Sequence, residues 1–364
     1  MDKTVAEYTP MMQEYLKTKS EYNDCILFYR LGDFYEMFFD DAKTASSELE
    51  LTLTGKSCGA EEKAPMCGVP FHAADNYINR LVQRGYKVAI CEQVEDPKQA
   101  KGLVKREVIR VVTPGTNIDQ MALDESSNNY IMSIVNNKSI FGVSICDIST
   151  ADFFVTEVDS IRKLNDEIAK FNPSEIIYSK DLLDSEFDIL EIAQRIQIST
   201  SLLDESNFDD TLATRALLDH FKVHSLESLG LLDFEYGKVA AGALLSYLKE
   251  TQKSELSHLT HLTPYTDGKF MLIDSSTRRN LELTETMRDK QKRGSLLWVL
   301  DKTKTAMGAR TLKSFIEQPL ISVDEIIKRQ DAIEDFNNSI FDMAKIQKQL
   351  ILNYPNVQTM KQFR

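Results

Sequence analysis

The sequence predicts a multidomain α/β protein, and three observations support this fold class. The chain has 364 residues, more than one hydrophobic core usually serves, and 42% of them are hydrophobic. Short runs rich in β-branched residues alternate with helical patterns through most of the chain. The C-terminal part is almost entirely helical in pattern. We therefore expect successive domains, of which the earlier ones contain sheets.

The first domain is expected over residues 1–116. A helix is predicted after Thr9, because threonine caps a helix and Pro10 suits its first position. Two apolar runs then flank the turn-like sequence "LGD", which favours paired strands. A stronger helical pattern follows in "HAADNYINRLVQRG", and "YKVAICEQV" and "EVIRVVTPG" have the composition of strands. This order of elements predicts a small mixed α/β domain.

The rest of the chain divides into a linker and two further domains. The polar, weakly patterned stretch over 117–128 is predicted to be the linker. Residues 129–250 show three strand-like runs, followed by a helix, a strand and further helices, which is compatible with a ribonuclease-H-like layered domain. The third domain, over 251–364, has one strand-like piece and is otherwise all-α. The apolar pattern around Trp298 predicts that this side chain is packed in a helical core.

The charge balance and the cysteines limit the function classes. With 43 Lys+Arg against 56 Asp+Glu the net charge is -13, which argues against a generic basic surface for nucleic acid but not against a local basic groove. No apolar run approaches the roughly 18 to 20 residues of a membrane span, and the N-terminus lacks a signal-peptide pattern, so a cytoplasmic protein is expected. The five cysteines are scattered, which predicts free thiols.

Two patterns that suggest cofactor sites fail on their spacing. The sequence "GKS" ends like a P-loop, but that loop needs a glycine where Glu50 stands. The pairs His220/His224 and His258/His261 have helical spacing but lack a catalytic glutamate or a third ligand. Neither nucleotide nor zinc binding is therefore expected from these residues.

Asp147 keeps an enzymatic alternative open. Ribonuclease-H-like nucleases place a metal-binding aspartate on the first strand of their sheet, and two-metal chemistry needs clustered carboxylates. Asp147 in "FGVSICDIST" fits such a strand, and Glu175 and Glu235 are further candidates without a recognisable position. A metal-dependent nuclease centred on Asp147 remains an alternative, as does a protein-interaction scaffold without DNA binding.

A basic strip lies at the end of the first domain. The sequence "KQAKGLVKREVIR" holds Lys98, Lys101, Lys105, Arg106 and Arg110 against a single acid. A local cluster of this kind in an acidic domain is a candidate for contacts with the DNA backbone. A solvated loop followed by an edge strand is the alternative interpretation.

The segment "RLGDFYEMFFDD" has an unusual distribution of side chains. In an extended strand, alternate residues from Phe34 to Phe38 point to one side and alternate residues from Tyr35 to Phe39 to the other. Glu36 therefore lies between two phenyl rings. A core should not contain that unpaired acid, and an exposed face should not contain those rings without a reason. The pattern indicates a functional surface.

The same segment resembles the mismatch-recognition motif of the MutS family, whose signature is Phe-x-Glu, here Phe34-Tyr35-Glu36. The stretch from "APMCGVPFHAADNY" to "REVIRVVTPGT" is similar to the remainder of the family's N-terminal domain, and "RRNLELTETMRDKQKRGSLLWVLDKTKTAMGARTLKSFIEQPL" to the start of its lever domain. The resemblance covers essentially the entire chain. It implies a mismatch-recognition domain (domain I), a ribonuclease-H-like connector (domain II) and a truncated lever domain (domain III) within the boundaries given above.

The resemblance also implies a function and a set of partners. In the family, the phenylalanine at the position of Phe34 wedges into the minor groove at a mispaired base, and the glutamate at Glu36 hydrogen-bonds to that base. Near DNA phosphates, the charge of Glu36 should penalise binding to intact duplex. The expected partners are mismatched duplex DNA and a MutL-like protein that contacts the connector. The resemblance implies a homodimer for the full-length family protein. For the 364 residues of this chain, a monomer is the alternative.

The resemblance implies no catalysis by these residues. The family's ATP and Mg²⁺ bind a C-terminal ATPase domain with a true P-loop, which these residues do not contain. No catalytic residue, cofactor site or metal site is therefore expected in the chain. A cytoplasmic protein associated with the nucleoid is expected.

Overall fold

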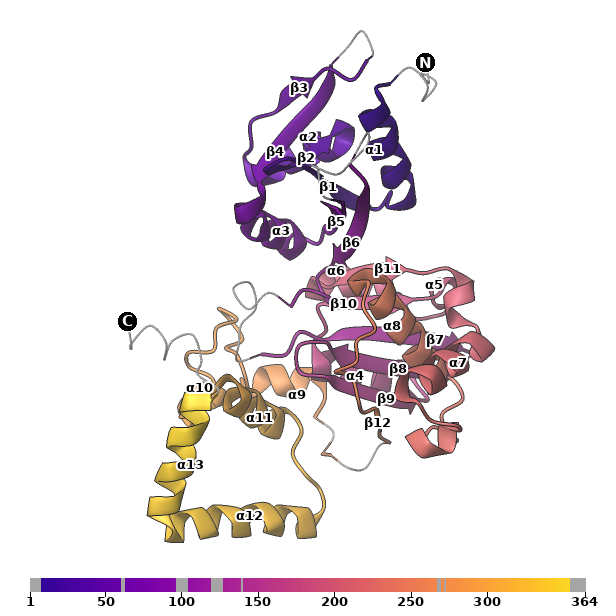
Figure 1. Ribbon diagram of the computed structural model, residues 1–364. Coiled ribbons are helices and arrows are strands. Elements are labelled where there is room, and N and C mark those ends of the chain that lie inside the picture. Colours follow the sequence, from indigo (N-terminus) through magenta and orange to yellow (C-terminus); the bar gives the residue numbers. More distant parts are fainter. Residues whose placement is uncertain are drawn as a thin grey trace.

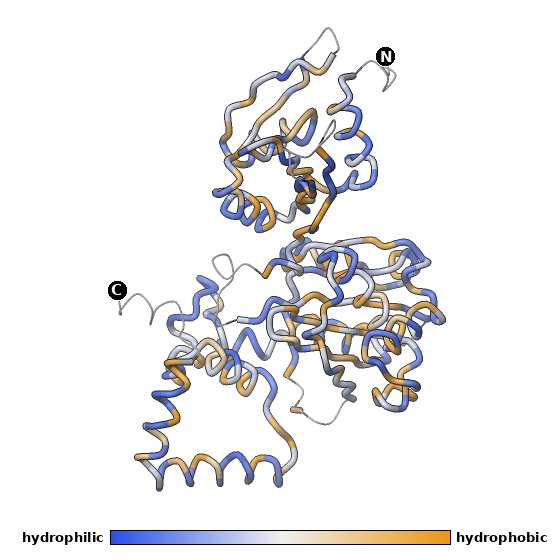
Figure 2. Tube along the Cα trace, in the orientation of Figure 1, coloured by the Kyte–Doolittle hydropathy of each residue, from blue (hydrophilic) through white to orange (hydrophobic). Residues whose placement is uncertain are grey.

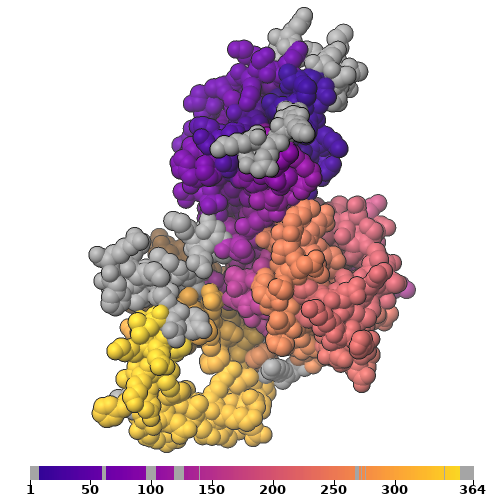
Figure 3. All heavy atoms as spheres, viewed as in Figure 1, coloured from indigo at the N-terminus to yellow at the C-terminus, as the bar shows by residue number. Residues whose placement is uncertain are grey.

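The computed structural model describes residues 8–59, 63–95, 104–118, 127–138, 140–266, 270–271 and 273–353. They form a first module (residues 8–112), a second module (127–264) and a helical region (273–353), which follow one another in space as in sequence (Figure 1). Each of the two modules has its own sheet. In the space-filling view the first module is a separate lobe on top of the second (Figure 3). The α/β class with successive domains is confirmed.

The first module is a six-stranded sheet with the order β3-β4-β2-β1-β5-β6. The β1–β5 pair is parallel, and the other pairs are antiparallel. The strands are β1 (Cys25–Leu31), β2 (Phe34–Phe38), β3 (Thr54–Lys56), β4 (Ala64–Pro70), β5 (Lys87–Gln93) and β6 (Arg106–Val112), and the helices are α1 (Pro10–Glu21), α2 (Phe39–Leu49) and α3 (Ala74–Gln83). The predicted first helix and the predicted hairpin are confirmed.

Helices cover both faces of this sheet. On one face, Tyr15 of α1 packs with Tyr29 and Phe38 in one buried cluster. On the other face, α2 and α3 pack in a second cluster that includes Phe28 and Met37. A strand that is buried on both faces carries apolar residues in both alternating sets, which explains the continuous apolar run of β1.

The predicted alternation along β2 holds to Phe38 and is wrong at Phe39. Phe39 was expected on the side of Tyr35, but its ring lies 6.1 Å from the ring of Tyr8 and 6.4 Å from that of Tyr15, on the α1 side. Its φ of 54° lies in the left-handed region. The chain leaves strand geometry at this residue because α2 begins here, and the period of two ends with the strand.

The second module is also built on a six-stranded sheet, with the order β11-β10-β7-β8-β9-β12. Strands β7, β8 and β9 form the expected antiparallel meander, while β10 pairs in parallel with β7 and β11, and β12 in parallel with β9. The strands are β7 (Ile131–Asn137), β8 (Ile140–Asp147), β9 (Asp152–Val158), β10 (Glu175–Tyr178), β11 (Ser199–Leu202) and β12 (Thr263–Pro264), and the helices are α4 (Ile161–Phe171), α5 (Lys180–Leu183), α6 (Ile189–Ile196), α7 (Asp210–Phe221) and α8 (Gly237–Gln252).

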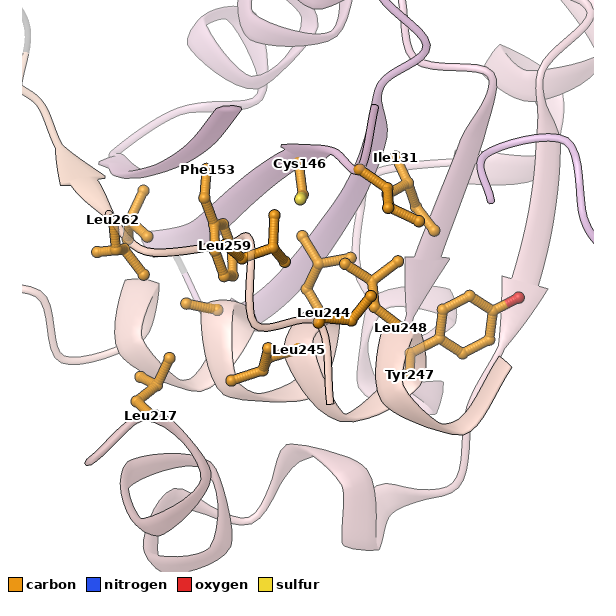
Figure 4. Packing of buried hydrophobic residues seen from close by; sticks show 14 of the residues in the cluster. Ile131, Cys146, Phe153, Leu217, Leu244, Leu245, Tyr247, Leu248, Leu259 and Leu262 are labelled. Atoms are coloured by element: carbon orange, nitrogen blue, oxygen red, sulfur yellow. The ribbon is translucent and has the colours of Figure 1, made fainter. Parts of the chain in front are cut away.

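Helix α8 crosses one face of this second sheet. Its leucines, among them Leu244 and Leu248, pack with Ile131 and Phe153 in one cluster (Figure 4). Residues of α4, α5 and α6 pack on the opposite face. At Gly142 of β8 an added β-carbon would stand 2.3 Å from the backbone just before α8, so the glycine permits this close approach.

The second module ends later than the sequence predicted. The expected boundary at residue 250 lies inside α8. Leu256, Leu259 and Leu262 are buried in the same cluster as α8, and β12 pairs with β9 beyond them. These leucines are isolated in a polar stretch without helical or strand period, and the packing that buries them is not visible in the local pattern.

The helical region contains α9 (Ser275–Asn280), α10 (Leu296–Leu300), α11 (Ala306–Glu317), α12 (Val323–Asn338) and α13 (Ile340–Asn353). Trp298 is 49% exposed, so the expectation that it is packed in a core is wrong. It lies on a helix of one turn, of which only Leu297 is buried. In the described part of the chain no helix is both long and apolar enough to span a membrane.

Candidate nucleic-acid interface

The hairpin of β1 and β2 presents Phe34 to solvent. Gly32 in the turn has a φ of 62°, a backbone conformation that residues with a side chain rarely adopt. The turn closes with the pairing of Leu31 and Phe34. The Phe34 side chain is 46% exposed, whereas Tyr35 and Met37 are buried in the module core. An apolar ring is thus held in water by a backbone that the core fixes.

A second exposed ring lies at the same end of the sheet. Phe34 is paired in register with Pro70 of β4, and the next residue, Phe71, donates its backbone N–H to the carbonyl of Asp33 at 2.9 Å. Phe71 is 43% exposed, and the guanidinium carbon of Arg30 lies 3.9 Å from the centre of its ring. Two apolar rings and one cation therefore gather around the hairpin turn.

Arg30 is held in place by a half-buried acid, Glu92. Its Nη1 lies 3.2 Å from Oε1 of Glu92, and the Tyr35 hydroxyl donates a hydrogen bond to the same oxygen. Burial, together with the hydrogen bond to Glu92, raises the pKa of Tyr35 above its ordinary value. The hydroxyl therefore remains a donor at neutral pH and helps to hold Glu92 in place.

Glu36 is paired with Lys56, a residue for which the sequence predicts no role. The Nζ of Lys56 lies 2.5 Å from Oε2 of Glu36, and it also lies 5.7 Å from the ring centre of Phe38. The Glu36 side chain is only 16% exposed. Gly68 of β4 lies opposite Glu36, where an added β-carbon would stand 3.5 Å from the Glu36 Cγ. The acid is tolerated between apolar rings because it has a cation and space.

Lys56 was missed because it belongs to the rejected P-loop pattern. The signal that identifies it is the short strand β3, whose alternation places Thr54 and Lys56 on one face of the sheet. Its partner is two strands away, and a pairing across a sheet is not visible along the sequence. The ion pair therefore comes from the tertiary structure.

The basic strip is divided by the alternation of β6. Arg106 is directed inward: its side chain is 7% exposed, and it donates hydrogen bonds to the carbonyls of Arg30 and Val104, both at 2.8 Å. Arg110 donates to the carbonyl of Thr116 at 3.3 Å.

Lys105 is the member of the strip that faces solvent. Its side chain is 67% exposed, and its Nζ is paired with Glu107 at 2.5 Å. Lys98 and Lys101 lie outside the described residues. Among the residues described, a row of cations that is continuous in sequence therefore does not form a continuous cationic surface.

Asp147 is occupied by hydrogen bonds. It is fully buried, and it accepts from Nδ2 of Asn128 and the backbone N–H of Asn129, both at 3.0 Å, and from the backbone N–H and hydroxyl of Ser149, at 2.8 and 2.7 Å. Glu235 is exposed. A carboxylate that is saturated by donors is a poor ligand for a metal ion, so the geometry does not support the nuclease alternative.

The histidine and cysteine side chains have structural positions. Nε2 of His220 lies 2.9 Å from the carbonyl of Leu259, and Nε2 of His258 lies 3.0 Å from that of Ile148. All five cysteines are buried free thiols, as expected. Within the described ranges, no group of three or more His, Cys, Asp or Glu side chains is placed to hold a metal ion.

The fold and this site define a modular α/β protein whose N-terminal sheet presents an exposed phenylalanine beside a lysine-paired glutamate. Three sequence profiles match the chain in succession: MutS domain I over residues 9–121, MutS domain II over 129–260 and MutS domain III over 276–359. The chain belongs to the MutS family.

Similar curated proteins are each named DNA mismatch repair protein MutS. That of Lachnoclostridium phytofermentans is 59% identical over 350 residues, which is 96% of this chain and 37% of the relative. That of Acetivibrio thermocellus is 49% identical over 97% of this chain and 42% of the relative. That of Ruminiclostridium cellulolyticum is 53% identical over 94% of this chain and 39% of the relative. The chain thus spans between 37% and 42% of the length of these relatives.

Proposed function

We propose that this chain recognises mismatched or unpaired bases in duplex DNA and so initiates DNA mismatch repair. The observation that carries the proposal is the exposed ring of Phe34 at the tip of a rigid hairpin, in a module that matches MutS domain I. The names of the curated relatives support it. In this proposal the chain binds DNA and catalyses no reaction itself.

Phe34 acts as a wedge. Insertion of an apolar ring between base steps costs a few kcal/mol of stacking free energy, and this cost is smallest where pairing is already weakened. Tyr35 and Met37 fill the core on the other side of the strand. Their burial fixes the strand, so the ring of Phe34 stays on the surface. Phe34 therefore selects sites that deform easily, without reading the sequence.

Glu36 contributes through its charge and its hydrogen-bonding capacity. At a mismatch, its carboxylate accepts a hydrogen bond from the displaced base. At an intact duplex no base donor is offered, and the carboxylate is repelled by the phosphates. Lys56 neutralises part of this charge in the free protein. We propose that Lys56 turns towards a phosphate when Glu36 engages a base, so that the ion pair is exchanged for two contacts with DNA.

The remaining modules serve coupling in this proposal. The strand order of the second module, a meander with two parallel strands beside its first strand, supports a ribonuclease-H-like connector. A MutL-like protein is its proposed partner. We assign the helical region, which matches MutS domain III, to the start of a lever domain. ATP and Mg²⁺ binding and homodimer formation are assigned to the longer proteins of the family.

The test is the substitution Phe34→Ala, measured by fluorescence anisotropy with a G·T and a matched duplex. We expect the variant to lose most of its preference for the mismatch and to keep non-specific binding, because phosphate contacts supply that affinity. Phe315→Ala is the matched control, since Phe315 is 43% exposed, close to the 46% of Phe34, but lies on α11. Equal losses on both duplexes would contradict the wedge. A chain without salt-dependent affinity for either duplex would instead be a protein-interaction scaffold.

A further inference from the structure

The connection between the first and second modules is buried. We call residues 113–117, "TPGTN", the joint. Thr113 and Thr116 are fully buried, and Asn117 is 5% exposed. Boundaries between domains usually lie in exposed segments that few contacts cross, and relative motion of the domains is then expected. A buried connection of this kind indicates a fixed orientation.

Glu175 occupies the centre of the joint. It is the first residue of β10 and is fully buried. Its Oε2 accepts hydrogen bonds from the hydroxyl of Thr113 and from the backbone N–H of Gly115, the latter at 3.1 Å. Its Oε1 accepts from the hydroxyls of Ser201 and Tyr247, both at 2.7 Å. One oxygen thus binds the joint, and the other binds the second module.

These donors offset the free energy of burying a carboxylate. An ionised acid without partners is very costly in a protein interior, whereas hydrogen bonds to a charged acceptor are among the strong ones. Tyr247 lies in the C-terminal half of α8, with its hydroxyl directed away from the aliphatic cluster (Figure 4). Burial, with the nearby Glu175 charge, raises the pKa of Tyr247 far above its ordinary value, so this hydroxyl remains a donor.

The joint also fits sterically. A β-carbon at Gly115 would stand 2.8 Å from Cβ of Ile131 and 2.9 Å from Cβ of Glu175, closer than real β-carbons approach. The backbone of the joint therefore lies directly on β7 and β10. Since this contact leaves no space for an added methyl group, the joint cannot shift along the second module without breaking its hydrogen bonds.

Side-chain amides connect the joint to both modules. Nδ2 of Asn117 donates to Oδ1 of Asn79, on α3 of the first module, at 3.0 Å. Nδ2 of Asn129 donates to the carbonyl of Pro114 at 2.9 Å, and Nε2 of Gln252 donates to that of Thr116 at 3.2 Å, both from the second module. Glu175 is the charged member of this network.

We infer that Glu175 is a positioning residue that locks the first module onto the second in one orientation. The lock makes the two modules move as one body. A displacement of the hairpin on DNA is then passed to the second module and is not absorbed at the connection. This last step rests on the proposed function, whereas the lock itself does not.

The lock is tested by the distance between one probe on each module of the whole chain. Spin labels are attached to cysteines introduced at Lys43 and Arg215, which are 59% and 80% exposed. The native thiols are buried, and burial raises the pKa of Cys67 to about 11 and that of Cys91 to about 12, so they compete poorly for the label. Double electron–electron resonance then gives the distribution of distances without DNA.

Glu175→Ala is expected to broaden this distribution about twofold, because free domains reorient. Glu175→Gln is expected to restore most of the narrow distribution, since the amide oxygen accepts from the joint while the hydroxyls of the second module accept from its NH₂. Glu157→Ala is the matched control. Its carboxylate accepts the N–H groups of Tyr236 and Gly237, at 2.6 and 2.8 Å, within the second module. It should lower the melting temperature and leave the distance distribution narrow.

Thr113→Val tests the lock from the other side and leaves the core of the second module unchanged. It removes one donor to Glu175 and is expected to broaden the distribution to a smaller extent. This variant decides the question if Glu175→Ala does not fold. Distributions as narrow as that of the unmodified chain in the folded variants would overturn the lock. Because no DNA is present, a failure of the mismatch proposal does not affect this result.

Discussion

At the scale of single residues, the electrostatic effect of Glu36 on DNA depends on Lys56 as much as on the charge of Glu36 itself. An acid near DNA repels phosphates, but an acid that is already paired presents a smaller field. The separation of 2.5 Å between Nζ and Oε2 makes the two side chains one electrostatic unit in the free protein. The discrimination assigned to Glu36 should therefore depend on both residues.

The first residue-scale prediction concerns this pair. Glu36→Gln should raise the affinity for matched DNA about fivefold at low salt, close to 1 kcal/mol, because the repulsion between the carboxylate and the phosphates is removed. Glu36→Ala should also lose about 0.5 to 1.5 kcal/mol at a G·T mismatch, since the hydrogen-bonding group is missing. Equilibrium binding to both duplexes at two salt concentrations measures these effects.

Lys56→Met completes a double-mutant cycle. Alone, it should weaken binding to matched DNA, because the full charge of Glu36 then faces the phosphates. In the Glu36→Gln background the same substitution should have a smaller effect if the pair is coupled. An effect of equal size in both backgrounds would reduce Lys56 to an ordinary phosphate contact. An unchanged matched affinity for Glu36→Gln at low salt would rule out the charge penalty.

The second residue-scale prediction separates Lys105 from Arg106. Lys105→Ala should leave stability nearly unchanged and reduce the slope of log K against log salt by about one for a lost phosphate contact. Arg106→Ala should lower the free energy of unfolding by roughly 1 to 3 kcal/mol, because buried carbonyls lose their donors. Urea denaturation and salt titration measure the two effects. The reverse assignment of effects would mean that Arg106 faces DNA.

At the scale of elements, the packing of α8 depends on a second glycine. A β-carbon at Gly242 would stand 2.4 Å from Cα and 2.5 Å from Cβ of Ala213, on α7. Gly242→Ala should therefore force the two helices apart and lower the free energy of unfolding by about 1 to 3 kcal/mol, although alanine favours the helix more than glycine does. Chemical denaturation checks this.

The control for this substitution is Ser246→Ala on the same helix. Ser246 is half-buried, and its replacement tests helix propensity without the clash. We expect a small gain or no change. A stabilised Gly242→Ala variant would show that α7 and α8 separate at little cost.

The elements that the sequence predicted well are those with a local signal. The β1–β2 hairpin follows from its alternation and turn, and the meander of the second module from three apolar runs. The exposed position of Phe34 was indicated by an acid two residues away. Lys56, in contrast, pairs with Glu36 across an intervening strand, and the inward position of Arg106 depends on which face of β6 the core covers. Such relations arise only when the sheet is assembled.

At the scale of the whole molecule, the borders between modules were the least predictable feature. The predicted linker begins at Asn117, yet this residue is buried, as are Thr113 and Thr116 just before it. The stretch after residue 250 also reads as a border, yet its leucines complete the core of the second module. Polar composition marks a border only where the polar groups meet water, and here they meet Glu175 and neighbouring carbonyls.

Helices α8 and α12 have the same length of 16 residues but opposite surroundings. Most of α8 is buried, whereas α12 has no buried residue, and polar and apolar positions are mixed along it (Figure 2). An isolated helix of this length is marginally stable in water.

Backbone amides of α12 should therefore exchange with deuterium orders of magnitude faster than those of α8, since α12 can open without global unfolding. Hydrogen–deuterium exchange read by mass spectrometry should divide the chain into a slowly exchanging pair of modules and a rapidly exchanging α12. Equal protection of the two helices would mean that α12 is covered in solution.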